Sequence, residues 1–174
     1  EFARELVRSF NFRYQSNALV EPQMKNTVVP KVLGIDGVNK MGKSLNNHIE
    51  LAATPEETQK RVLQMVTDPQ RLRRDDPGDP DICNVFSMHK IFSPVEEVEM
   101  INTECRRAGI GCVDCKKRFA VNLNANLAPF RSKRSELEAD PQAVWDILHD
   151  GAKRARILAD QTMEKVRSAI QLPL

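Results

Sequence analysis

The chain has 174 residues, of which 41% are hydrophobic and 29% charged, and its formal net charge is +2. This length allows one good-sized domain, or a small domain with an appendage, and the near-neutral charge excludes a strongly basic nucleic-acid binder. No apolar run approaches the roughly 20 residues that span a bilayer, and the charged, amphipathic start of the chain does not have the pattern of a signal peptide.

The first predicted elements are a helix and a short strand. Apolar side chains between residues 2 and 14 lie on one broad helical face, which is typical of an amphipathic helix. Because this pattern is helical from its first residue and no initiator methionine stands before it, we expect the chain to be part of a longer protein. A short run at residues 31–33 predicts a strand, and Gly34 and Gly37 bound the turn after it.

A loop with two lysines follows this turn, with the sequence Lys40-Met41-Gly42-Lys43-Ser44; it is called the lysine loop below. Two mobile ammonium groups, small residues and exposed backbone N–H donors suit a polyphosphate. A solvated loop that carries lysines without binding anything is the alternative, and the local sequence alone favours it.

The rest of the chain predicts successive helices, each with a start signal. In Thr54-Pro55-Glu56-Glu57 the threonine stands at the N-cap, the proline at the first helical position and a glutamate at the third, which together form a capping box. We therefore expect a mainly α-helical chain with at most one or two short strands. The remaining signals are, in chain order, Asp79-Pro80 for a helix through His89, Ser93-Pro94-Val95-Glu96 for a second capping box and a helix ending near Gly109, a long helix over residues 112–138 kinked at Pro129, Asp140-Pro141 for a helix interrupted near Asp150-Gly151, and a last amphipathic helix over residues 155–170.

All four cysteines fall in one window, at Cys83, Cys105, Cys112 and Cys115. Because nothing in the sequence suggests secretion, we expect thiols rather than disulfides. Four thiolates suit a tetrahedral Zn site or a [4Fe–4S] cluster, and the spacing does not decide between them. Four buried free thiols are the alternative, since cysteine is often buried.

Two pairs of basic residues flank the cysteines, Arg106 with Arg107 and Lys116 with Lys117. Grouped positive charge favours contact with nucleic-acid phosphates. A solvated or salt-bridged surface is the usual outcome for any one such cluster and remains the alternative.

The lysine loop resembles the Lys-Met-Ser-Lys-Ser signature of class I aminoacyl-tRNA synthetases, with Gly42 where that family normally has serine. Further segments resemble bacterial tryptophanyl-tRNA synthetases, and the resemblance covers nearly the whole chain. These segments are residues 67–80, 83–86, 108–117 and 127–131.

This resemblance implies a C-terminal portion of a tryptophan–tRNA ligase, which joins tryptophan to its tRNA with ATP and Mg²⁺. Residues 1–50 would be the tail of a Rossmann-like class I catalytic domain, and residues 51–174 a helical domain that receives the tRNA anticodon. The tryptophan pocket would be missing, so we expect the chain alone to be inactive and monomeric, although the family is homodimeric. The resemblance also implies a cytoplasmic protein with no membrane association.

Roles for individual residues also follow from the resemblance. Lys40 and Lys43 would be catalytic, meeting the charge that develops on the leaving pyrophosphate. ATP would be bound by Val32, Met41, Gly42 and Ser44, with Met41 against the adenine.

The resemblance favours iron–sulfur over Zn on the four cysteines, because some similar synthetases carry a [4Fe–4S] cluster there. It also favours tRNA contact for the flanking basic pairs. The alternative function is a free-standing iron–sulfur or zinc module that binds RNA without ligase activity.

Overall fold

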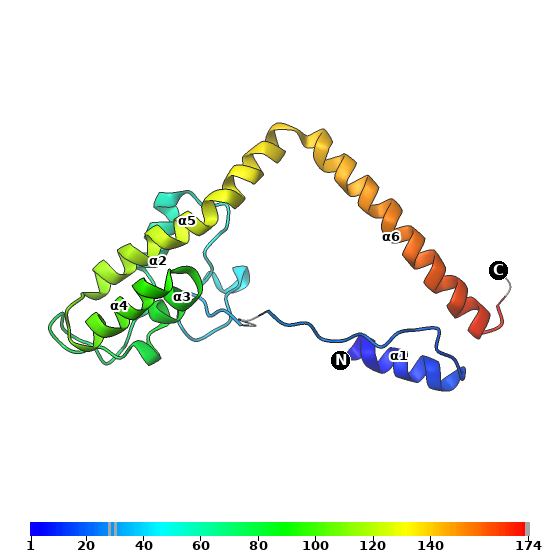
Figure 1. Ribbon diagram of the computed structural model, residues 1–174, viewed down its shortest axis with the longest axis horizontal. Helices are drawn as coiled ribbons and strands as arrows, with labels where there is room; N and C mark the ends of the chain where they lie inside the picture. Colours follow the sequence, from blue (N-terminus) through cyan, green and yellow to red (C-terminus); the bar gives the residue numbers. More distant parts are fainter. Residues whose placement is uncertain (28, 30, 173–174) are drawn as a thin grey trace. The chain divides into compact units, whose positions relative to one another are not determined.

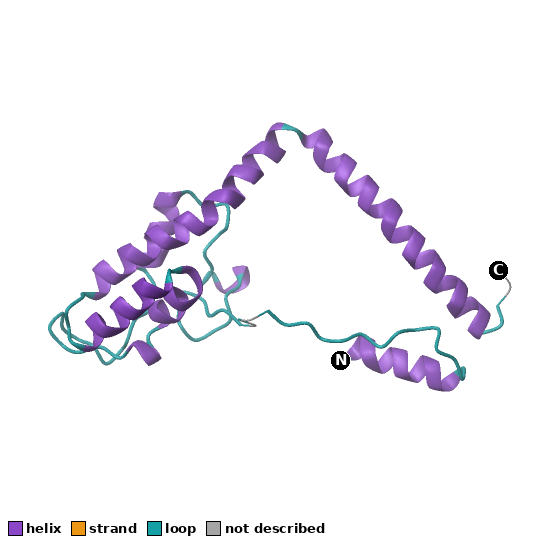
Figure 2. Cartoon of the chain, viewed as in Figure 1, coloured by secondary structure: helices purple, strands orange, loops and turns teal. Residues whose placement is uncertain are grey.

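The computed structural model describes residues 1–27, 29 and 31–172. The chain divides into two compact units, a terminal unit of Glu1–Asn26 with Leu137–Leu174 and a central unit of Thr27–Glu136. Helices and loops make up the described residues (Figure 2), and the only β-pairing among them is an isolated bridge between Leu33 and Lys40. The mainly helical prediction is confirmed, while the predicted strand at residues 31–33 is reduced to that bridge. The predicted functional division after residue 50 stays a prediction.

The terminal unit contains α1 (Phe2–Arg13) and α6 (Pro141–Ala169), and neither helix has a buried residue. Local interactions shape both ends of the unit. Arg8 donates to both carboxylate oxygens of Glu21 at 2.9 and 2.5 Å, which ties the segment after α1 back to that helix. In α6, Asp140 accepts from the backbone N–H of Ala143 at 3.1 Å, as an N-cap does.

The predicted interruption of α6 near Gly151 is wrong. The helix is continuous, and a Cβ at Gly151 would meet nothing within 4 Å. An exposed helical glycine costs only about 0.5–1 kcal/mol, and Asp150 pairs with Arg154 at 3.0 Å across the same turn. No helix of the described part of the chain is long and apolar enough to cross a membrane.

The central unit is built from α2 (Pro55–Leu63), α3 (Asn84–Phe92), α4 (Val95–Arg106) and the greater part of α5 (Cys112–Ala139), shown in Figure 1. The unit also contains two short 3-10 turns, η1 (Lys43–Leu45) before α2 and η2 (Pro80–Ile82) before α3. Buried apolar side chains from all four helices form one core, and each such side chain contributes about 1.5–3 kcal/mol of burial free energy. Its largest fully buried members are Phe119, Met65, Ile101, Val62 and Val85.

Helix α2 packs alongside α5, and side chains of α5 hydrogen-bond to carbonyl groups of α2. Lys116 donates to the carbonyl of Leu63 at 3.0 Å, and Asn124 donates to the carbonyl of Pro55 at 3.2 Å. Because the higher-numbered residue of α5 meets the lower-numbered residue of α2, the two helices run antiparallel. Further along, α5 continues through Pro129 without ending.

The capping box at Thr54 is confirmed. The backbone N–H of Glu57 donates to the Thr54 hydroxyl at 3.2 Å, and the Glu57 carboxylate accepts from the Thr54 N–H at 2.8 Å. The Asp79-Pro80 signal starts only the turn η2, because Cys83 takes an extended backbone conformation and ends it. The α-helix then starts anew at Asn84.

The second capping box, predicted at Ser93, is wrong. Helix α4 has Pro94 at its N-cap and no side-chain cap. The Ser93 hydroxyl instead lies 2.7 Å from Nδ1 of His89 and accepts from Asn122 at 2.9 Å. The signal fails because its hydroxyl is used in a contact with α5, a partner distant in sequence.

Candidate functional site

The lysine loop leaves a tight turn that the bridge between Leu33 and Lys40 closes. The backbone N–H of Gly34 donates to Asn39 at 2.9 Å. Gly37, at the tip, has a φ of +69°, a left-handed conformation that favours glycine. The turn therefore delivers the chain into the lysine loop in a defined direction.

Asp36 organises this turn with its carboxylate. Its Oδ1 accepts from the backbone N–H groups of Val38 and Asn39 at 3.0 and 3.1 Å, and its Oδ2 accepts from Asn47 at 2.9 Å. The hydrogen bond from the Asn47 side chain is the largest of several that lower the pKa of Asp36 to about 2. Asp36 was not predicted from the sequence, although an aspartate in a turn is a recognised signal for an Asx turn.

Asn47 connects the turn to the lysine loop. Its side chain is buried, with 3% of the residue exposed. Its Oδ1 accepts from the backbone N–H of Gly42 at 2.8 Å, while its Nδ2 donates to Asp36 and, at 3.3 Å, to the carbonyl of Lys40. Its own carbonyl accepts from the N–H of Ile35 at 2.8 Å. Asn47 was not predicted from the sequence either, since a lone asparagine belongs to no recognisable motif.

The residues of the lysine loop divide into an exposed and a packed set. Lys40, Lys43 and Ser44 are exposed. Met41 is half-buried and packs against the core together with Val32. A backbone hydrogen bond of 3.0 Å from Met41 to Val32 joins the two residues predicted to touch adenine. The loop thus presents its ammonium and hydroxyl groups to solvent from a fixed apolar base.

Gly42 does not need to be a glycine for conformational reasons. Its φ of −167° and ψ of 148° are extended backbone that any residue adopts. A Cβ there would approach nothing closer than the carbonyl of Lys40 at 3.9 Å. Serine, the usual residue of the resembled signature, would fit at this position.

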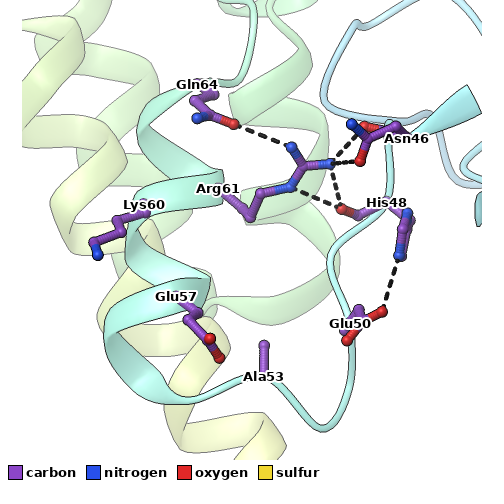
Figure 3. A pocket seen from close by; sticks show the side chains of 8 residues that line it. All are labelled: Asn46, His48, Glu50, Ala53, Glu57, Lys60, Arg61 and Gln64. Atoms are coloured by element: carbon purple, nitrogen blue, oxygen red, sulfur yellow. Dashed lines mark hydrogen bonds and ion pairs between the residues drawn. The ribbon is translucent and has the colours of Figure 1, made fainter.

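An open pocket of about 420 Å³ lies where the chain leaves the lysine loop (Figure 3). Arg61 of α2 crosses it, donating to the carbonyl of Asn46 at 2.5 Å and to that of His48 at 3.0 and 3.1 Å. Its other nitrogen donates to Gln64 at 3.1 Å. Since the guanidinium is used by the chain itself, it fixes the loop exit and is poorly placed to bind an anion. The pocket is lined by Asn46, His48, Glu50, Ala53, Glu57, Lys60, Arg61 and Gln64.

A second pocket, of about 320 Å³, lies beside the segment before the turn. Val32 and Leu33 form one part of it, and Asn84 and Met88 of α3 another. Its walls are mostly apolar side chains, which suits a flat heteroaromatic ring. The full lining is Val29, Lys31, Val32, Leu33, Asn84, Ser87, Met88, Lys90 and Ile91.

The four cysteines gather around Arg71 and the start of α5. One guanidinium nitrogen of Arg71 lies 3.9 Å from the sulfur of Cys105 and 3.8 Å from that of Cys112. The other donates to the carbonyl of Arg74 at 2.5 Å. Gly78 packs against the same cluster, where a Cβ would come within 2.7 Å of the Cys105 sulfur. Arg71 was also missed as a partner of the thiols.

Burial favours the neutral form of three of the thiols, those of Cys83, Cys105 and Cys115. Burial raises the pKa of Cys115 to about 12, and burial also raises the pKa of Cys83 and of Cys105. The Cys115 sulfur lies 3.6 Å from Nε2 of His89, whose pKa is lowered, mainly by burial. A neutral imidazole beside a neutral thiol is a packed polar contact and not an activated nucleophile.

The prediction of a [4Fe–4S] cluster, or of Zn in its place, is not supported. In residues 1–27, 29 and 31–172, no group of three or more histidine, cysteine or acidic side chains has an arrangement that could hold a metal ion. Two of the predicted ligands, Cys105 and Cys112, lie instead against the guanidinium of Arg71, whose positive charge would repel a metal ion at the same sulfurs. The residues predicted as ligands were Cys83, Cys105, Cys112 and Cys115.

The basic residues predicted to contact RNA are exposed or partly exposed, and three of the four have partners within the chain. Arg106 pairs with Asp81 at 2.6 Å, and Arg107 pairs with Glu104 in the preceding turn. Such surface ion pairs are weak in water, so a phosphate can replace the carboxylate at little cost.

Lys116 is partly exposed and donates to the carbonyl of Leu63, while Lys117 beside it is exposed. Lys116 therefore contributes to the contact between α5 and α2. The two lysines follow the cysteine cluster directly along α5, as the sequence suggested.

Comparison with protein families identifies one matching family model, described as tRNA synthetases class I (W and Y), which matches residues 1–128. Among curated proteins, the chain is 41% identical over 174 residues to the tryptophan–tRNA ligase of Aquifex aeolicus. It is also 41% identical over 173 residues to that of Thermotoga maritima. Each alignment covers 99% of this chain, but only 44% and 52% of the two relatives.

Comparison with solved structures gives the same kind of relative. The chain resembles the tryptophanyl-tRNA synthetase of Campylobacter jejuni complexed with ADP and tryptophan, with a TM-score of 0.77 and 28% identity. That match covers 97% of this chain and 52% of the other. The chain therefore spans about half the length of the proteins it matches.

Proposed function

Since the chain belongs to the class I tRNA synthetases of the tryptophan and tyrosine group, we propose that it is the C-terminal part of a tryptophan–tRNA ligase. The choice of tryptophan rests on the curated relatives, which are tryptophan–tRNA ligases at 41% identity. The choice of the C-terminal part rests on the lysine loop and the helices after it, which correspond to late segments of the resembled family. The observation that carries the proposal is the exposed pair Lys40 and Lys43 on a loop with a fixed backbone.

The lysine loop serves the activation of the amino acid. The tryptophan carboxylate attacks the α-phosphorus of ATP, the bond to the bridging oxygen breaks, and pyrophosphate leaves with added negative charge. Lys40 and Lys43 meet that charge with their ammonium groups after the loop closes. Mg²⁺ enters with the nucleotide and neutralises part of its phosphate charge.

The nucleotide lies against the apolar base of the loop. Val32 and Met41, which share a backbone hydrogen bond, contact the adenine. Ser44 donates its hydroxyl to a phosphate, and the backbone at Gly42 leaves room for the phosphates to approach. The apolar pocket beside Val32 and Leu33 is of a size for the purine ring.

The helices after the loop hold tRNA. Arg106, Arg107, Lys116 and Lys117 contact backbone phosphates, and the helical region receives the anticodon. The full ligase acts as a cytoplasmic homodimer. The alternative of a free-standing iron–sulfur or zinc module is not favoured, because the described residues offer no metal-binding group and the relatives are ligases.

The proposed function is tested with the longer protein that contains this chain. Tryptophan-dependent exchange between ATP and pyrophosphate is expected, with no exchange when tyrosine replaces tryptophan. Exchange driven by tyrosine alone would place the protein in the other branch of its family. The isolated 174-residue chain is expected to give no exchange above background.

Binding to tRNA is tested by charge reversal at Lys117, which leaves the contact between Lys116 and Leu63 intact. The Lys117→Glu variant is expected to weaken binding of tRNA and to reduce the slope of log K against log salt by roughly one unit. The matched control is Lys25→Glu, an exposed lysine outside the proposed tRNA-binding region. An unchanged slope would assign Lys117 to an ordinary solvated surface.

A further inference from the structure

We infer that Asn47, oriented by Asp36, is a positioning residue that fixes the lysine loop in the conformation from which Lys40 and Lys43 act. This inference rests on the proposed function for its catalytic consequence, and on the geometry of the loop for its physical basis. Neither residue belongs to the phosphate-binding signature itself.

The first step is the placement of the Asn47 side chain between two points of the loop. Its Oδ1 accepts from the N–H of Gly42 and its Nδ2 donates to the carbonyl of Lys40. These two groups flank Met41, whose N–H is bonded to Val32. The backbone of Lys40, Met41 and Gly42 is thus fixed by hydrogen bonds. The side chains of Lys40 and Lys43 therefore extend from a backbone of defined conformation.

The second step is the orientation of the amide. The Asp36 carboxylate can only accept, so it requires Nδ2 of Asn47 to face it, at 2.9 Å. Oδ1 must then face Gly42, where an N–H needs an acceptor. A hydrogen bond to an ionised group is stronger than a neutral one, so the Asp36 contact makes one orientation of the Asn47 amide dominant.

The third step is that other groups cannot replace this amide. Alanine removes both contacts to the loop, so the part-buried N–H of Gly42 and carbonyl of Lys40 lose this partner. Aspartate keeps an acceptor for Gly42 but loses the donor and brings a second negative charge against Asp36. Only a carboxamide of this length supplies both an acceptor and a donor at these distances.

The fourth step concerns the reaction. Lysines that stabilise a leaving group act through placement, and a misplacement of about 1 Å can cost around 100-fold in rate. Besides the bridge at Lys40 and the contacts of Met41 with Val32, the Asn47 amide links the backbone of the loop to the buried part of the central unit. Loss of this link is expected to lower kcat more than it raises the KM for ATP.

The test uses the longer protein with the substitutions Asn47→Ala and Asn47→Asp. The matched control is Asn39→Ala, which also removes a hydrogen bond to Asp36, of 3.2 Å, but touches neither Lys40 nor Gly42. In tryptophan-dependent pyrophosphate exchange, both Asn47 variants are expected to lose about 10- to 100-fold in kcat. Asn39→Ala is expected to stay within about twofold, since one exposed hydrogen bond contributes little.

A second readout needs no catalytic activity. Without substrates, trypsin is expected to cleave after Lys40 and Lys43 faster in the Asn47→Ala protein than in wild type, because cleavage follows local opening. Cleavage after Lys153 should not change. If wild type shows no exchange at all, the proposed function fails, while this proteolysis still decides whether Asn47 holds the loop.

Two outcomes would overturn the inference. One is that Asn47→Ala matches Asn39→Ala in both kcat and cleavage at the loop. The other is that both Asn47 variants lose the cooperative unfolding transition, since Asn47 would then support the whole fold and not the loop in particular.

Discussion

The lysine loop and the cysteine cluster are opposite kinds of motif within the same central unit. In the loop, the chemical groups of Lys40 and Lys43 are exposed and the backbone that carries them is held. In the cluster, the sulfurs of Cys83 and Cys115 are buried and the pKa of each is raised. The contrast indicates that the residues packed around a motif, more than its spacing, decide whether its side chains are accessible and reactive.

The largest expected effect comes from replacing one of the exposed lysines of the lysine loop. In the longer protein, Lys43→Ala is expected to lower kcat for pyrophosphate exchange by about 10²–10³, the usual cost of removing one donor aimed at developing charge. The KM for ATP should change much less. Steady-state exchange kinetics measure both constants, with Lys153→Ala on α6 as the control. Equal effects of the two substitutions would make the loop an ordinary solvated segment.

The backbone contacts of the lysine loop can be disrupted by a substitution outside the loop, at Gly34. A Cβ at Gly34 would lie 2.2 Å from Nδ2 of buried Asn47, so Gly34→Ala must displace that amide. We expect a loss of about 1–3 kcal/mol in the free energy of unfolding, as for other overpacked sites, and reduced exchange activity. Gly151→Ala, with open space around it, should instead gain about 0.5–1 kcal/mol. Urea unfolding of both variants measures the contrast, and a loss of similar size in both would contradict it.

Alkylation measures how accessible each thiol of the cysteine cluster is. In the reduced protein, iodoacetamide is expected to modify half-buried Cys105 and Cys112 before Cys83 and Cys115, which are 7% and 9% exposed. Peptide mass spectrometry after timed labelling gives the order. If all four cysteines were equally protected from alkylation and a chelator removed this protection from all of them together, they would be ligands of one metal and not free thiols.

The smallest expected effect is the response of the turn to acid. The pKa of Asp36 is lowered in the folded protein to about 2, from an ordinary value of 3.8, chiefly by the Asn47 hydrogen bond. The ionised carboxylate therefore stabilises the fold above pH 3.8, and this contribution is lost as the pH falls from 3.8 towards 2. NMR titration of the Asp36 carboxyl in wild type and Asn47→Ala measures the shift. The pKa should be higher in the variant, and an unchanged value would remove Asn47 as its cause.

The helices could be predicted from the sequence where the signal was local. Thr54 with Glu57 is such a case, since the capping box needs only neighbours three residues apart. Ser93 shows the opposite, because its hydroxyl was used by His89 and Asn122. A start signal holds when no distant partner competes for the same atom.

In the candidate site, the exposed lysines could be predicted from the sequence, but the side chains that contact the loop and the thiols could not. Lys40 and Lys43 were found because their spacing is written in the sequence. Asn47 and Arg71 were not, because each acts through contacts to groups that only the fold brings together. The metal prediction had the same weakness: clustering of cysteines in sequence says nothing of the guanidinium between two of them.

Gly42 has a consequence for how this family can vary. Its backbone is one that any residue adopts, and a Cβ there meets nothing closer than 3.9 Å. A serine hydroxyl can therefore be lost or regained at this position by one codon change, with no compensating change elsewhere. Because glycine and serine both fit this backbone, loops of this kind can carry either residue while the two lysines keep their spacing.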